Sequence, residues 1–229
     1  MSWDKKEDYC GLANGTSVKI KGSDEGATGS YLEKVGEHGD IVATKAYGTK
    51  NASPKCVYTI ADDGTLAIKL GTVTTVDGKQ YMLESVSVST GGASEPTLEA
   101  SAKRVEDGAT TGCTFDCPSL TISPDEHAQV LFNAFSLSGD GCELTACSAA
   151  VGCTIGLSKI NDDPVASDPH TAHIQLSVTI LQTGETKPTV TPADGWDLSA
   201  PLTCSDPDSD LPTWTCSVAK PLTKTLASA

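Results

Sequence analysis

The sequence predicts a mainly β protein, an antiparallel β-sandwich or barrel with one short α-helix at about residues 124–135. Apolar and polar residues alternate in several runs, above all in IQLSVTIL at 174–181, where the apolar side chains would share one face of a strand. The chain is rich in Gly, Ser, Thr and Asp, and aromatic residues make up only 5% of its 229 residues. This composition is typical of strands and turns.

The first 40 residues are polar and rich in Gly, and we expect an N-terminal arm and loops with one short strand at 18–20. Regular strand signals begin at residue 41, with predicted strands at 41–46 and 56–60. In TLAIKL at 65–70 the apolar residues again occupy alternate positions, which predicts a strand with one buried face.

Two further strands are predicted around the turn VDGK at 76–79, because an Asp-Gly pair favours a two-residue hairpin. The following run, YMLESVSVST, places Leu83 on one face and Val86 and Val88 on the other, which predicts a β-bulge near Glu84. The next strand, TLEASAKRV at 97–105, alternates cleanly. Together these segments predict a meander of antiparallel strands.

The helix is predicted from SPDE at 123–126, where Ser would be the N-cap, Pro the first helical residue and Glu the third. His127, Val130, Leu131 and Ala134 then fall on one helical face. We expect three segments: the arm at 1–40, a β-sandwich domain with this helix at 41–190, and a C-terminal hairpin or extension at 191–229.

Nine cysteines are present, so at least one has no partner within the chain. No hydrophobic secretion signal begins the sequence, and no run of about 18 apolar residues would cross a membrane. We therefore expect synthesis in the cytoplasm, where cysteines are reduced, and bridges only after release into an oxidising medium. Within the C-terminal hairpin, pairing about its midpoint places Cys204 opposite Cys216, a possible disulfide.

The formal net charge of −14 argues against wrapping nucleic acid and against docking on an anionic membrane. It is consistent with simple solubility, or with a surface that must not adhere to passing DNA.

No motif predicts catalysis or a cofactor: GxSxG, GxGxxG and P-loop patterns do not occur in the sequence. The C-x3-C pair at 113 and 117 would need Cys142, Cys147 or the His170 and His173 pair to complete a zinc site, and small buried thiols are the simpler interpretation. Asp206, Asp208 and Asp210 lack the Gly and Glu of a calcium loop. We therefore predict no catalytic, cofactor or metal residues and no enzyme.

The order of these elements over residues 40–181 resembles that of the tail tube proteins of long-tailed bacteriophages, and the stretch TVTTVDGKQYMLESVSVSTGGASEPTLEASAKRV at 72–105 is similar to strand and turn sequences of phage virion proteins. The resemblance implies hexameric rings that stack into a tube, made in the bacterial host cytoplasm and found in the virion. The partners would be other copies of the chain and other tail proteins, with DNA passing through without specific binding.

The resemblance also implies roles for particular residues. Acidic residues on solvent faces of strands, such as Glu84 and Glu99, would carry lumen charge. A loop would contact the neighbouring subunit, and the residues predicted for it are Gly91, Gly92, Ala93, Ser94, Glu95 and Pro96. Exposed sheet edges would pair with another chain.

Two alternatives share this fold class. One is a capsid decoration or other head protein, which would also be acidic and without catalytic motifs. The other is an adhesin or carbohydrate-binding module, which would present exposed aromatic side chains in a groove. Trp196 and Trp214 together on an exposed surface would favour that second alternative.

Overall fold

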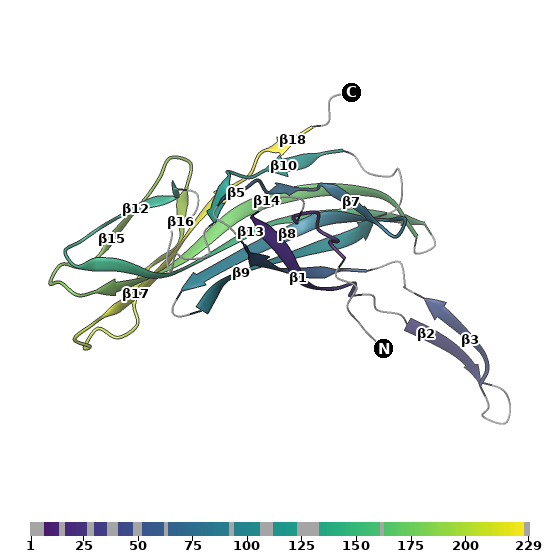
Figure 1. Ribbon diagram of the computed structural model, residues 1–229, viewed down its shortest axis with the longest axis horizontal. Coiled ribbons are helices and arrows are strands. Elements are labelled where there is room, and N and C mark those ends of the chain that lie inside the picture. The colour runs from purple at the N-terminus through teal and green to yellow at the C-terminus, as the bar shows by residue number, and fades with distance from the viewer. Residues whose placement is uncertain are drawn as a thin grey trace.

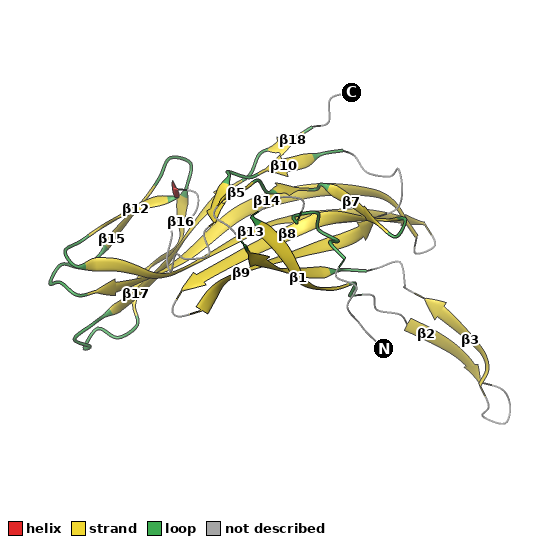
Figure 2. Cartoon of the chain, in the orientation of Figure 1, coloured by secondary structure: helices red, strands yellow, loops and turns green. Residues whose placement is uncertain are grey.

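The computed structural model describes residues 7–13, 17–26, 30–35, 41–47, 52–61, 64–91, 94–105, 112–122, 133–160 and 163–226. Antiparallel strands form most of this part of the chain, which confirms the predicted mainly β fold class (Figure 1, Figure 2). The sheets are open, so the sandwich-like architecture holds rather than a closed barrel. The strands are β1 (Val18–Asp24), β2 (Ser30–Val35), β3 (Ile41–Tyr47), β4 (Lys55–Ile60), β5 (Gly64–Leu66), β6 (Lys69–Leu70), β7 (Val73–Val76), β8 (Lys79–Gly91), β9 (Ser94–Val105), β10 (Thr114–Asp116), β11 (Leu120–Ile122), β12 (Phe135–Ser138), β13 (Cys142–Ile160), β14 (Asp163–Gln182), β15 (Thr189–Pro192), β16 (Asp197–Cys204), β17 (Thr213–Pro221) and β18 (Lys224–Thr225).

The largest sheet has nine strands in the order β1-β4-β9-β8-β13-β14-β17-β16, with β7 also paired to β8. At its centre, β13 and β14 form a long hairpin that is paired from Cys142 and Gln182 at one end to Ile160 and Asp163 at the other. The hairpin of β2 and β3 projects away from this sheet, and β12 pairs with β15 near the opposite end (Figure 1). Strands β1 and β16 form the two edges.

One face of the nine-stranded sheet is the core face. Alternate residues of the central strands point to this face, because successive side chains in a strand point to opposite sides. One row of directly paired residues crosses six strands, and each of its side chains is at most 2% exposed. The residues of this row are Tyr58, Leu98, Val88, Ala149, Leu176 and Val218.

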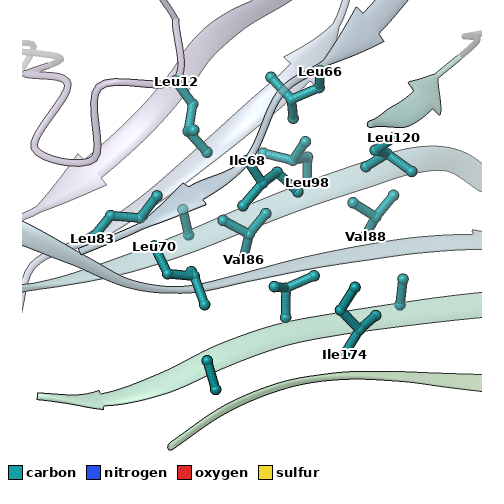
Figure 3. Packing of buried hydrophobic residues seen from close by; sticks show 14 of the residues in the cluster. Leu12, Leu66, Ile68, Leu70, Leu83, Val86, Val88, Leu98, Leu120 and Ile174 are labelled. Carbon is teal, nitrogen blue, oxygen red and sulfur yellow. The ribbon is translucent and has the colours of Figure 1, made fainter. Parts of the chain in front are cut away.

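Short strands and the segment 7–13 cover the core face as a second layer. Figure 3 shows Leu66, Ile68 and Leu120 pointing toward the valines and leucine of β8 and β9. The predicted alternation at 65–70 is confirmed, because Leu66, Ile68 and Leu70 are buried, although β5 and β6 pair with different neighbours. Burial of each leucine or isoleucine contributes about 1.5–3 kcal/mol.

The predicted hairpin turn and the predicted β-bulge are both confirmed. Val76 pairs with Lys79, and Asp77 and Gly78 have φ values of 49° and 73°, so a two-residue turn with both residues left-handed joins β7 to β8. The register between β8 and β9 shifts between Leu83 and Ser85, which is the predicted bulge at Glu84.

The predicted helix at 124–135 falls mainly outside the described residues. Asn133 forms a short helical piece beside β12, and Phe135 already begins that strand (Figure 2). Helix therefore contributes little to the part of the chain that the structure describes.

The two ends of the chain are joined to the main sheet. Strand β1 pairs with β4, and Cys10 and Leu12 of the preceding segment belong to the core. Strands β16 and β17 form the expected C-terminal hairpin and extend the sheet beyond β14. Residues 7–13, strand β1 and the C-terminal hairpin thus share one core with the central strands.

Candidate assembly surface

The face of the nine-stranded sheet opposite the core, which we call the outer face, carries short hydroxylated side chains. A second row of directly paired residues crosses seven strands, from β4 to β16, one position along from the buried row. Its members, which we call the hydroxyl row, are Thr59, Thr97, Ser89, Ser148, Ser177, Ser217 and Ala200. The central members are exposed. The same strands are therefore apolar on one side and carry mainly Ser, Thr, Ala and Gly on the other.

Some hydroxyl groups of the outer face are paired with each other. Ser177 Oγ lies 3.0 Å from Ser217 Oγ across β14 and β17, and Ser85 Oγ lies 2.7 Å from Ser101 Oγ across β8 and β9. Removing a hydroxyl from water costs less free energy when it already has a hydrogen-bond partner within the protein, because that hydrogen bond remains. Short side chains also lose little rotamer entropy when they are covered. Both properties lower the cost of covering this face.

The outer face also carries little charge although the net charge of the chain is −14. At the outward positions that the structure describes within 85–89, 146–152, 173–179 and 215–221, no Asp, Glu, Lys or Arg occurs. Charged residues of this face lie on the flanking strands, among them Lys19 of β1, which pairs with Thr59 of the hydroxyl row, Lys55 of β4, Glu99 of β9 and Asp197 of β16. Covering the centre of the face would therefore bury no ion.

A shallow hollow of about 390 Å³ lies on this face over β13, β14, β16 and β17. Its wall is made where β16 departs from regular pairing, with register shifts on both sides of Ala200, and Pro201 lies in the irregular stretch. The floor consists of Ser148, Ser177 and neighbouring small residues.

The two glutamates predicted to carry lumen charge lie in different surroundings. Glu99 is exposed on the outer face, directly opposite Ser87 of β8. Glu84 lies at the bulge and is half-buried. Burial raises the pKa of the Cys153 thiol to about 12, and the charge of Glu84 adds to this effect.

The predicted contact loop at 91–96 is shorter than expected. Gly91 of β8 pairs with Ser94 of β9, so Ser94, Glu95 and Pro96 belong to a strand. Gly92 and Ala93 lie outside the described residues.

The register of the C-terminal hairpin differs from the expected one. Cys204 lies opposite Trp214 rather than Cys216, and both cysteines carry free thiols. Residues in this diagonal relation are about 7–8 Å apart, which is too far for a bridge without movement of the backbone. The turn at 205–213 sets this register, because the amide of Ser205 donates to the oxygen of Thr213 and the pairs Cys204–Trp214 and Thr203–Thr215 follow regularly, whereas the register shifts of β16 lie farther along, around Ala200.

Trp196 and Trp214 do not form an exposed aromatic platform. Trp196 is only 7% exposed and belongs to the core. Trp214 is half-buried, and its Nε1 donates a hydrogen bond of 2.8 Å to Gln182 Oε1. Lys187 Nζ lies 4.8 Å from the centre of the Trp214 ring. This residue is therefore held within its own chain.

A second hollow, of about 550 Å³, is lined by Cys113, Asp168 and His170 among others. Lys224 Nζ donates to both carboxylate oxygens of Asp168, at 2.8 and 3.0 Å, and this raises the pKa of Lys224. The carboxylate is therefore already engaged. Within the described residues no three His, Cys, Asp or Glu side chains are grouped so that they could hold a metal ion.

Comparison with known proteins does not place the chain in a family. No family model matches the sequence, and no curated protein matches it. Among the helical residues that the structure describes, none belongs to a helix long and apolar enough to span a membrane.

Sequence reasoning missed the hydroxyl row as a surface. The signal within one strand is visible in SVSVS at 85–89, where Ser alternates with Val. The alignment of that pattern with β13, β14 and β17 depends on pairing between distant segments, which no local pattern reveals.

Proposed function

We propose that this chain is a structural subunit that associates with further copies of itself through the outer face of its nine-stranded sheet, as a virion protein of the tail tube type. The observation that carries the proposal is the hydroxyl row with its uncharged surroundings. A sheet face of this kind can pack closely on another surface at small desolvation cost. The resemblance to tail tube proteins supplies the arrangement in stacked rings.

The irregular edge strands of the sheet favour assembly through the outer face rather than by strand pairing at the edges. Strand β1 has a register shift between Ile20 and Gly22, and β16 has shifts on both sides of Ala200. Bulges and an edge proline such as Pro201 interrupt the row of free backbone groups that an added strand would need. Edge pairing, which the sequence led us to expect, is therefore the weaker route to assembly.

The net charge agrees with a tube through which DNA passes. Acidic residues outside the contact would repel phosphates, so the genome would not adhere to the wall. A head decoration protein would have the same composition, and the shape of the assembly distinguishes it from a tube. A carbohydrate-binding module is less favoured, because Trp196 is buried and Trp214 is held by Gln182.

The test is to place a large charge at the centre of the proposed contact. Ser148→Arg and Ser177→Arg, made separately, would bury an unpaired guanidinium on association. We expect each to raise the dissociation constant of the assembly by at least about a hundredfold, measured by size-exclusion chromatography with light scattering. Ser136→Arg, at an exposed serine of β12, is the matched control and should assemble like the unmodified chain.

If both substitutions leave the mass of the assembly unchanged, the contact does not lie on the outer face. A chain that remains monomeric at millimolar concentration would contradict self-association altogether.

A further inference from the structure

The segment 7–13 is tied to the core face of the sheet by one carboxylate. Asp8 Oδ1 accepts hydrogen bonds from the amide of Gly11 at 2.8 Å and from Tyr58 Oη at 2.6 Å, and Asp8 Oδ2 accepts one from the amide of Ala13 at 2.8 Å. The ring of Tyr9 packs edge-on against that of Tyr81, with centroids 4.9 Å apart. These contacts fix the backbone on both sides of Cys10.

Cys10 is thereby held against Cys56 of β4. The two residues are 2% and 0% exposed and belong to the same core cluster, and each thiol shifts the pKa of the other. Cys56 Sγ also donates to the backbone oxygen of Glu7 at 3.8 Å. Two thiols from distant parts of the sequence are therefore neighbours in the core, on the face of the sheet away from the proposed assembly surface.

We propose that Cys10 and Cys56 form a redox pair that closes to a disulfide when the chain meets a small-molecule disulfide such as oxidised glutathione. The Cys56 thiolate attacks one sulfur of the oxidant, which forms a mixed disulfide and releases one glutathione thiolate. The Cys10 thiol then gives its proton to that thiolate and attacks the Cys56 sulfur, which releases the second glutathione. The two protein thiols lose two electrons and two protons, and the oxidant becomes two thiols.

The surroundings of the two thiols determine which one attacks the oxidant and which one then closes the disulfide. The interaction with Cys10 lowers the pKa of Cys56, and Tyr58 contributes in the same direction. The same interaction, together with burial, raises the pKa of Cys10. Cys56 is therefore the thiol that reacts first at neutral pH. Because both sulfurs are buried, reaction requires the segment 7–13 to open.

Other cysteines are worse placed for the same chemistry. Burial raises the pKa of both Cys117 and Cys153 to about 12, so neither is a ready nucleophile at neutral pH. Cys204 and Cys216 are diagonal on neighbouring strands. Closure of the Cys10 and Cys56 pair would instead join the N-terminal segment to the sheet in the position that it already has.

The pair can be tested by peptide mapping of the whole chain. Native protein is incubated with excess oxidised glutathione, unfolded, alkylated and cut with trypsin without reduction. Cys10 lies in the tryptic peptide 7–19 and Cys56 in 56–69, and neither peptide contains another cysteine. We expect these two peptides to be linked in most of the protein, and the link to disappear on reduction. The oxidised chain should also melt at least about 5 °C higher than the reduced chain.

Cys10→Ser should abolish the linked peptide, whereas Cys204→Ser is the control that should retain it. Recovery of both peptides in alkylated form from the oxidised unmodified chain would overturn the proposal. So would a link from either peptide to other cysteines in comparable yield.

Discussion

At the scale of single residues, small polar groups decide how segments are held in this protein. Asp8 accepts hydrogen bonds from three backbone amides and a buried tyrosine hydroxyl. Glu25, just after β1, accepts hydrogen bonds of 2.9 Å from both Lys79 and Tyr81 of β8. Each carboxylate joins a segment near the N-terminus to the sheet. Neither role was predicted from the sequence, because both partners are about 50 residues away along the chain.

Glu25 makes stability depend on pH. The hydrogen bond from Lys79 lowers the pKa of Glu25 below its usual value of 4.5, although partial burial opposes this effect. A depressed pKa means that the stabilisation is complete above the pKa of the unfolded chain and is lost as the pH falls through the folded value. We expect the fall in unfolding free energy between about pH 6 and pH 3 to be smaller in Glu25→Gln, by about 0.5 kcal/mol because the pair is partly exposed.

Urea denaturation at the two pH values measures this difference. Glu143→Gln, at an exposed position of β13, is the control and should keep the pH dependence of the unmodified chain. An equal fall in Glu25→Gln and in the unmodified chain would show that the contact contributes nothing.

At the scale of elements, the sequence predicted those strands in which apolar and polar residues contrast strongly. The strand at 174–181 and the turn at Asp77 and Gly78 were found where the pattern indicated them. Strand β13 was not predicted at its full length, because Cys, Ala, Ser and Gly in residues 142–160 give little contrast in hydropathy. The bulge at Thr171, whose φ is 50°, likewise has no sequence signal, since a β-branched residue rarely adopts that conformation.

The hairpin of β7 and β8 offers a prediction at this scale. Gly78 has a φ of 73° and open space around the position of an added Cβ, so Gly78→Ala would meet only a backbone penalty. We expect a loss of about 1 kcal/mol in unfolding free energy. Gly152→Ala in β13 is the matched control, because its added Cβ would lie at an ordinary distance of 3.7 Å from Ser85 and its φ is not positive.

Thermal or urea denaturation of the two variants compares them directly. The prediction fails if Gly78→Ala is as stable as Gly152→Ala.

At the scale of the whole molecule, the net charge opposes association between copies, whereas the outer face favours it. Copies with a net charge of −14 repel each other at a distance, whereas the centre of the outer face presents no ionic charge to a partner. Salt shortens the range of repulsion, to about 10 Å at 0.1 M and about 3 Å at 1 M. It does not weaken a contact made of hydroxyl groups and small side chains. Assembly should therefore increase with salt.

Composition predicted the acidic character and the fold class, but it could not predict where the charge is absent. That information arises only when β8, β13, β14 and β17 are aligned in register. In the proposed rings, the outer face is the surface through which copies would associate.

Negative-stain electron microscopy of the purified chain at about 0.1 M and about 1 M salt tests this account most directly. We predict rings or short tubes that become more abundant at the higher salt concentration. Separate monomers at both salt concentrations, with the protein concentrated to the millimolar range, would contradict it.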